Sequence, residues 1–317
     1  MLSARTGSRS RLFVYMLSLI GIEADLALVR SFAFDATQSD TPDDDTYGDL
    51  AIRVQGSTGP FWVETGLDHS AFGTISPLVR GQEALMLRTP FERTTVSTTP
   101  LETDLRTVDV DVTLAANGSA RATITETFRG VPAATWRGEL ENIPDAQLEN
   151  IFGENYVARL LPGARMESLR ITGREDHEMP LVFRYEVDVL ELGRLENGVR
   201  LLPSLFPSAL TPSFARLSER TRAQVIPPLA MDLEVHLHVP EGAVIEAPED
   251  AAFEGETGAS IRYTSVRDDR GAELHRHVRI QRARVQPAQY PAFAAQCRGA
   301  DEYEAREVRV RMPTATP

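Results

Sequence analysis

The chain has 317 residues, of which 42% are hydrophobic and 25% charged, so its composition is that of a folded globular protein and not of a disordered or fibrous one. The net charge of -13 repels phosphate backbones, which predicts that nucleic acid is not a partner. Cys297 is the single cysteine, and all 33 basic residues are arginine. These counts exclude an intrachain disulfide framework, a cysteine-rich metal site and chemistry that depends on a lysine, such as a Walker motif or a Schiff base.

The first segment with helical spacing is residues 8–21, and a glycine at its end provides a stop signal. Its apolar stripe consists of Leu12, Met16, Leu19 and Ile20, with Phe13 and Leu17 beside them. The apolar run is about 11 residues long and is closed by two acidic residues, which is too short for a transmembrane segment of ~20 residues. Three arginines precede the run, as in a signal peptide. We favour a helix of the core over a signal peptide.

Three short strands are predicted after this helix, at residues 24–29, 49–54 and 61–64, with an acidic loop at 35–45. Residues 89–104 are rich in Thr, Ser and Pro and lack a period, so we interpret them as a linker. We therefore expect a first domain at 1–88 and a second at 105–317. A chain of this length is consistent with two domains.

Strands dominate the second domain. Apolar residues alternate with polar ones on both sides of Asn117-Gly118, which predicts a β-hairpin with a tight turn. Helices are expected near 145–161 and 290–299. Further strands are predicted at 166–172, 181–190, 199–202, 233–239, 260–265, 274–285 and 306–312. No internal repeat is evident. The fold class expected is α+β, mostly β, with a β-sandwich-like antiparallel second domain.

Several phrases in the first 90 residues resemble the second half of the bacterial transglutaminase-like core. The phrases are Gly21-Ile22-Glu23-Ala24, Tyr47-Gly48-Asp49, Trp62-Val63-Glu64-Thr65, Phe72-Gly73, Ser76-Pro77 and Gly81-Gln82-Glu83-Ala84-Leu85. They recur in the family's order, and the last run is the strongest match. The resemblance implies a cysteine-protease-like core with a helix packed on antiparallel strands, a trailing β-rich segment, and a bacterial envelope or periplasmic location. The chain itself shows no convincing export signal.

The resemblance also implies a catalytic triad of cysteine, histidine and aspartate, in which the thiolate attacks an amide carbonyl. The cysteine position falls on Thr6, or on Arg9 in a second alignment with Ser8 between them. The histidine position falls on Asp49 and the aspartate position on Glu64. Because a hydroxyl is far less acidic than a thiol and a carboxylate is a weak base, we infer that the amide chemistry is lost.

Other polar groups suggest weaker candidate sites. Asp49 and Glu64 on neighbouring strands resemble a carboxylate pair for acid-base catalysis, although they also fit a degenerate site. The acidic loop is rich in oxygen ligands, but its spacing does not match an EF-hand, so a solvated loop is favoured over a calcium site. Its acidic residues are Asp40, Asp43, Asp44 and Asp45. No cofactor is expected.

Four histidines are placed two apart on two predicted strands, and residues i and i+2 share one strand face. They are His236 and His238 on one strand, and His275 and His277 on the other. If the strands pair, four imidazoles meet and form a site for zinc or copper. The alternative is that the apolar neighbours face the core and the histidines face water, and we favour it.

Three functional hypotheses follow. The preferred one is a non-catalytic transglutaminase-like protein with a binding or structural role in the cell envelope, alone or with other envelope proteins. The second is a hydrolase or amidase that uses Asp49 and Glu64 with a hydroxyl of Thr6 or Ser8. The third is an accessory subunit whose core is completed by a separate chain that supplies the leading domain.

Overall fold

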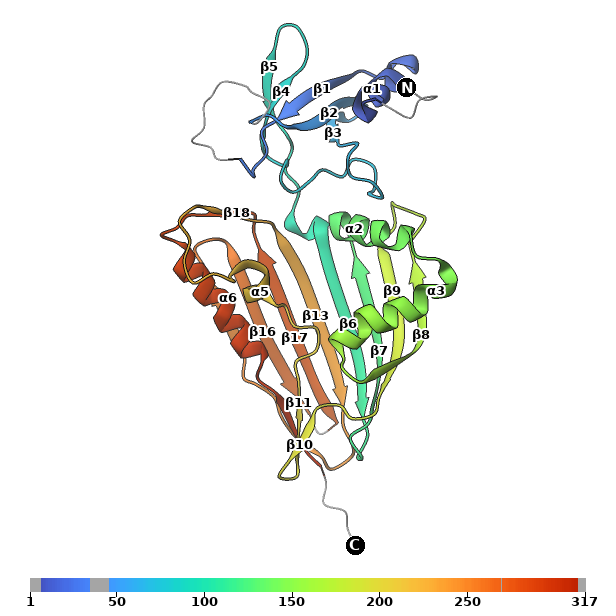
Figure 1. Cartoon of the computed structure of the whole chain (residues 1–317), viewed down its shortest axis with the longest axis vertical. Coiled ribbons are helices and arrows are strands. Elements are labelled where there is room, and N and C mark those ends of the chain that lie inside the picture. Colours follow the sequence, from blue (N-terminus) through green and yellow to red (C-terminus); the bar gives the residue numbers. More distant parts are fainter. Residues whose placement is uncertain (1–6, 35–45, 269, 313–317) are drawn as a thin grey trace.

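The computed structural model describes residues 7–34, 46–268 and 270–312. Its first part is an antiparallel five-stranded sheet in the order β3-β2-β1-β4-β5, with helix α1 (Arg9–Leu19) packed on one face (Figure 1). The strands are β1 (Ala24–Val29), β2 (Asp49–Gly56), β3 (Gly59–Val63), β4 (Glu83–Met86) and β5 (Glu92–Thr95). The predicted succession of one helix and three strands is confirmed.

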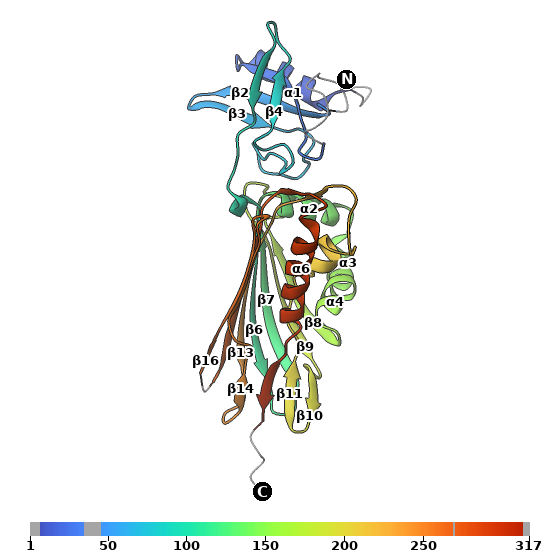
Figure 2. The same cartoon turned by 90° about the vertical axis from the view of Figure 1, so that its left-hand side faces the viewer.

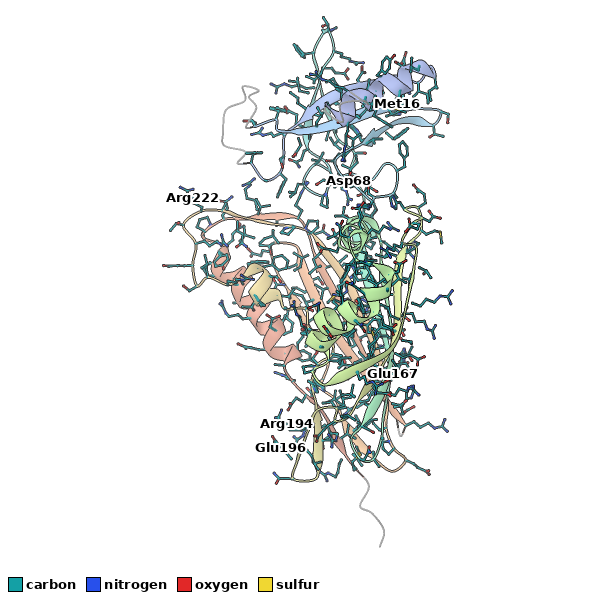
Figure 3. The ribbon with its side chains drawn as sticks, turned by 45° about the vertical axis from the view of Figure 1, so that its right-hand side comes forward. Met16, Asp68, Glu167, Arg194, Glu196 and Arg222 are labelled. Carbon is teal, nitrogen blue, oxygen red and sulfur yellow. The ribbon has the colours of Figure 1, made fainter. Side chains whose placement is uncertain are left out.

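Helix α1 faces the sheet with one side of the predicted apolar stripe, and the other side of the stripe is exposed. Phe13 and Leu17 pack against the sheet, whereas Met16 and Ile20 are more than half exposed. Met16 is labelled on α1 in Figure 3. The side chains of Ser10, Phe13 and Leu17 follow the 3.6-residue period along one face. A hydrogen bond of 2.7 Å between the hydroxyls of Ser10 and Thr65, which follows β3, fixes this face toward the sheet.

The segment 89–104 contains more structure than a linker. It includes β5, which pairs with β4 at the sheet edge, and a 3₁₀-helix, η1 (Leu101–Asp104). Both faces of β5 are at least partly accessible, so its residues are polar throughout and no hydrophobic alternation marks the strand.

The second part is built on an eight-stranded sheet in the order β15-β16-β17-β13-β6-β7-β9-β8. All neighbours are antiparallel except β6 and β13, which are parallel at the centre. The strands are β6 (Leu105–Leu114), β7 (Ala120–Phe128), β8 (Ala164–Thr172), β9 (Leu181–Val189), β13 (Leu229–His238), β15 (Ala251–Glu254), β16 (Ala259–Arg267) and β17 (Gly271–Ile280). The predicted hairpin is confirmed as β6–β7, with Gly118 at a positive φ of 91°.

One face of this sheet carries the core, and the other is open to solvent. Helices and short strands gather on the covered face, as the edge-on view shows (Figure 2). The helices are α2 (Gly130–Glu141), α3 (Asp145–Phe152), the π-helical turn η2 (Gly153–Val157), α4 (Ala158–Leu160), α5 (Leu210–Phe214) and α6 (Tyr290–Glu304). The expected helices near 145–161 and 290–299 are present, and the first is divided by the π turn.

Two smaller sheets complete the second part. One has the order β10-β11-β19-β14 and packs over one end of the large sheet. The other pairs β12 with β18. Their bounds are β10 (Arg194–Glu196), β11 (Val199–Leu202), β12 (Gln224–Ile226), β14 (Val244–Glu246), β18 (Ala283–Val285) and β19 (Val308–Arg311). The expected class, α+β and mostly β with antiparallel sheets, is confirmed.

Candidate functional site

The positions that resemble a catalytic triad lie at the ends of strands β2 and β3. Asp49 begins β2, and Glu64 directly follows β3. The β2–β3 register pairs Ile52 with Val63, so its extension by one residue places Glu64 opposite Ala51, two residues from Asp49. The structure therefore brings the two predicted carboxylates together at one corner of the first sheet.

The Glu64 carboxylate is bonded to a backbone N–H, and its pKa depends on burial and on neighbouring charges. Its carboxylate accepts a hydrogen bond from the backbone N–H of Ser76, in the loop that follows. Burial of the carboxylate raises its pKa to about 7, and the negative charge of Asp49 adds to this rise, while the Ser76 bond and Arg80 oppose it. Near neutral pH the Glu64 carboxyl is therefore partly protonated.

The hydroxyl pair and the carboxylate pair are on opposite faces of the sheet. Ser10 belongs to α1, which covers the face that carries Ile52. Ser76 follows Ile75, which packs with Trp62 on the other face. Within the described residues, no hydrogen bond links Ser10 or Thr65 to either carboxylate. The arrangement does not form a relay from a hydroxyl to a carboxylate.

The remaining hydroxyls proposed as nucleophiles have other positions. Ser8 is the N-cap of α1, and its side chain accepts a hydrogen bond of 3.3 Å from the Arg11 N–H. Thr6 lies outside the described residues, as do the four aspartates of the acidic loop. The structure therefore places one of the two predicted hydroxyls, and it acts as a helix cap.

The single thiol is far in the chain from this corner and is buried. Cys297 is buried in α6, where it packs in the core with Tyr290 and Phe293. Burial raises the pKa of its thiol to about 12, and Asp301 adds to this rise. A thiol with this pKa has almost no thiolate at neutral pH.

The four histidines lie on the outer face of the large sheet, and their strands β13 and β17 do pair. The register, however, sets His236 opposite Glu273, His275 opposite Glu234 and His277 opposite Asp232. His238 instead lies 3.1 Å from Asp111. Each imidazole thus has a carboxylate neighbour, so the predicted meeting of four imidazoles is replaced by a mixed pattern of imidazoles and carboxylates.

One group on this face has ligand atoms close enough to share a metal ion. Asp109, Glu234 and His236 offer three ligand atoms within 4.8 Å of one another, which is the metal-capable cluster among the described residues. His236 Nε2 lies 3.1 Å from Glu234 and Nδ1 lies 3.3 Å from Glu273. Both imidazole nitrogens therefore already have carboxylate partners, which is the geometry of a surface ion-pair network.

Sequence reasoning missed the residues that organise the interior. Ser10 and Thr65 belong to quoted or neighbouring phrases, but only the fold brings them together. Glu126 and Glu304 are buried acidic residues, on strand β7 and helix α6, whose sequence patterns do not mark them as buried. Glu126 accepts hydrogen bonds from Arg106, Tyr156 and Tyr185. No short-range pattern predicts such partners, because they come from other strands and helices.

Comparisons with known proteins match part of the chain to a domain family and find one similar solved structure. The family model of DUF3858, described as a domain of unknown function with a solved structure, matches residues 198–308, which run from β11 to β19. A crystal structure at 2.00 Å from Parabacteroides distasonis ATCC 8503, named "putative protease", is similar with a TM-score of 0.47 and 10% sequence identity. The similarity covers 95% of this chain and 42% of that one, so the chain spans less than half its length. A search of curated proteins finds no match.

Proposed function

We propose that the chain is a non-catalytic relative of the transglutaminase-like proteins, with a binding or structural role in the bacterial cell envelope. The observation that carries the proposal is the pair of carboxylates at the strand ends. Where the resemblance requires an imidazole beside a carboxylate, the structure has Asp49 beside Glu64. The envelope location comes from the resemblance alone.

Charge and reactivity support the absence of amide chemistry. Burial and the charge of Asp49 favour the protonated form of Glu64, whereas an imidazole is needed to deprotonate a thiol and to protonate the leaving amine. The Ser10 hydroxyl on α1 and the Thr65 hydroxyl are bonded to one another on the opposite face. Cys297 is buried in another core and stays protonated at neutral pH. Among the residues that the structure describes at this corner, no nucleophile is bonded to a base.

An exposed apolar surface on α1 supports a partner for the first part. It consists of Tyr15, Met16, Leu19 and Ile20, each between 56% and 71% exposed. Large exposed apolar side chains that are adjacent mark interaction surfaces. The partner in this proposal is another protein of the envelope. Among the described residues, no helix has the length and apolarity to cross a membrane.

The proposal is tested by a hydroxamate and amine-incorporation assay on glutamine-containing peptides. We expect no turnover from the wild-type chain and no change in Asp49→Asn, Glu64→Gln or the exposed control Glu149→Gln. Turnover that is abolished in Asp49→Asn and retained in Glu149→Gln would overturn the proposal in favour of the hydrolase hypothesis.

A further inference from the structure

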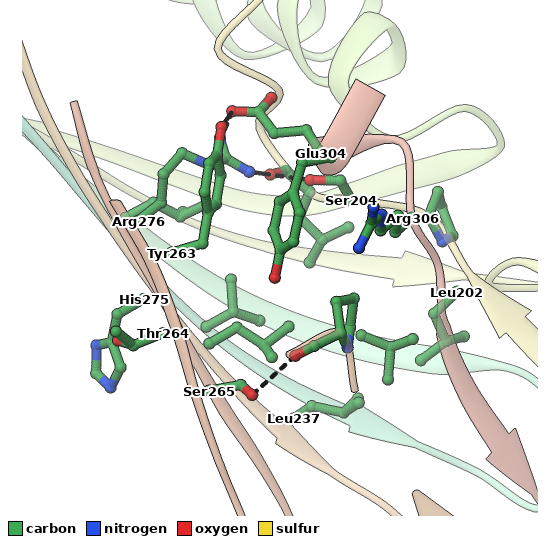
Figure 4. A pocket seen from close by; sticks show the side chains of 18 of the residues that line it. Leu202, Ser204, Leu237, Tyr263, Thr264, Ser265, His275, Arg276, Glu304 and Arg306 are labelled. Carbon is green, nitrogen blue, oxygen red and sulfur yellow. Dashed lines mark hydrogen bonds and ion pairs between the residues drawn. The ribbon is translucent and has the colours of Figure 1, made fainter. Parts of the chain in front are cut away.

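A cavity of about 90 Å³ lies in the second part, between the covered face of the large sheet and the overlying strands β11 and β19 (Figure 4). The sheet wall is formed by alternate residues of β13 and by one residue of β6. These are Val112, Leu233, Val235 and Leu237, and Leu202 and Val308 form the opposite wall. Cores are otherwise close-packed, so a cavity with leucine and valine walls is a place where an apolar group gains contacts.

The inner end of the cavity is closed by an ion pair and by hydrogen-bonded polar groups. Arg276 Nε lies 3.1 Å from Glu304, and Tyr263 donates a hydrogen bond of 2.8 Å to the same carboxylate. Arg276 also donates to the Ser204 hydroxyl at 2.9 Å and to backbone carbonyls. Arg276 Nε itself makes no hydrogen bond, but Glu304 compensates the charge of the guanidinium. The inner end therefore has no net charge, which favours an apolar group there over a second anion.

The opening of the cavity, unlike its interior, is lined by exposed residues. Of the residues that line the cavity, Pro203 and Arg306 are exposed. The Arg306 guanidinium lies 4.9 Å from the centre of the Tyr303 ring and, among the described residues, has no ion pair. An exposed cation at the opening of an apolar cavity is complementary to an anion that carries an apolar tail.

We propose that this cavity binds a free alkanoate, with its alkyl chain between the two walls and its carboxylate on Arg306. The cavity is smaller than the 150 Å³ apolar cavity that holds a benzene ring, so a few carbons fill it. This size favours a free acid over a lipid with two long chains. The inference goes beyond the proposed function and does not depend on it, because it concerns the second part alone.

The test is calorimetric titration of the full chain with butanoate, hexanoate, octanoate and octylammonium, and with phosphatidylglycerol vesicles. We expect affinity to rise about fourfold per added methylene between the shorter acids and then to level off as further carbons remain in water. Octylammonium should bind more weakly than octanoate. Absence of saturable alkanoate binding at millimolar concentration, or binding to vesicles only, would overturn the proposal.

Two variants separate the roles of charge and cavity. Arg306→Gln should weaken octanoate binding about two- to fivefold and remove the preference over octylammonium, whereas the exposed control Arg298→Gln on α6 should not. Val235→Phe fills the cavity and should abolish binding. If Val235→Phe does not fold, Leu205→Trp is tested in its place, because Leu205 also lines the cavity but lies on an irregular segment. Undiminished binding in a folded cavity-filling variant would contradict the proposal.

Discussion

Arg80 and Asp104 form a buried ion pair that joins the two parts of the molecule. Arg80 belongs to the loop that covers the first sheet, and Asp104 ends η1, at the entrance to β6. Both side chains are less than a tenth exposed. Asp104 also accepts a hydrogen bond of 2.9 Å from the Val131 N–H at the start of α2. One carboxylate therefore fixes the linker, the first sheet and a helix of the second part.

Replacement of this carboxylate should be strongly destabilising. Asp104→Ala leaves the Arg80 guanidinium buried without its charge partner, which costs about 3–5 kcal/mol of unfolding free energy. The measurement is urea unfolding. The control Asp68→Ala removes an exposed ion pair with Arg9 and should cost less than about 1 kcal/mol. Equal effects of the two substitutions would contradict this description of the junction.

Stability should depend on pH through Glu64. Its pKa rises on folding from the ordinary 4.5 to about 7, so the folded state holds the proton more tightly than the unfolded state. Its contribution is present below pH 4.5 and is lost as the pH rises through 7, by about 3 kcal/mol at most. Glu64→Gln should therefore be more stable than wild type at pH 8, measured by thermal unfolding, with little difference at pH 4.

The exposed control for this pH effect is Glu149→Gln on α3, which should leave the pH dependence of unfolding unchanged. If wild type and Glu64→Gln lose stability in parallel between pH 5 and 8, the environment of Glu64 is not as described.

Glu126 should be essential for the packing of the second part. It is fully buried on β7 and accepts hydrogen bonds from Arg106 and from the hydroxyls of Tyr156 and Tyr185, at 2.7–2.8 Å. Glu126→Ala leaves the arginine and both hydroxyls without their acceptor, so we expect a loss of about 3–5 kcal/mol. Exposed Glu186 on β9 is the matched control. A small effect in chemical unfolding of Glu126→Ala would contradict this assignment.

The histidine face should not retain a metal. Each imidazole has a carboxylate neighbour, and His236 has one at each ring nitrogen. We predict less than one equivalent of zinc or copper in purified protein, measured by elemental analysis. Stoichiometric zinc that is lost in His236→Gln and kept in His277→Gln would show that Asp109, Glu234 and His236 form a metal site.

Local patterns predicted much of the fold. Asn117-Gly118 is sufficient for a hairpin, since glycine accepts the positive φ that this turn requires. Helix α2 was not predicted, because Gly130, Pro132 and Gly138 interrupt the helical pattern, and packing on the sheet compensates for them. The parallel pairing of β6 with β13 joins residues more than 100 positions apart, and no local pattern encodes it.

The candidate site was predicted only in part. The strand order placed Asp49 and Glu64 together, but the face on which each side chain lies depends on packing. Ser10, and not the predicted Met16, faces the sheet because its hydroxyl bonds to Thr65. The cavity at Arg306 was not predicted either, since its walls come from strands that are distant in the chain.

The proposed loss of acyl-transfer chemistry is tested most directly by the rate at which native Cys297 reacts with iodoacetamide at neutral pH. Its burial and raised pKa predict labelling only as fast as the protein unfolds, so that urea accelerates it strongly and Asp49→Asn leaves it unchanged. Rapid stoichiometric labelling of the folded chain, slowed by Asp49→Asn, would contradict the account.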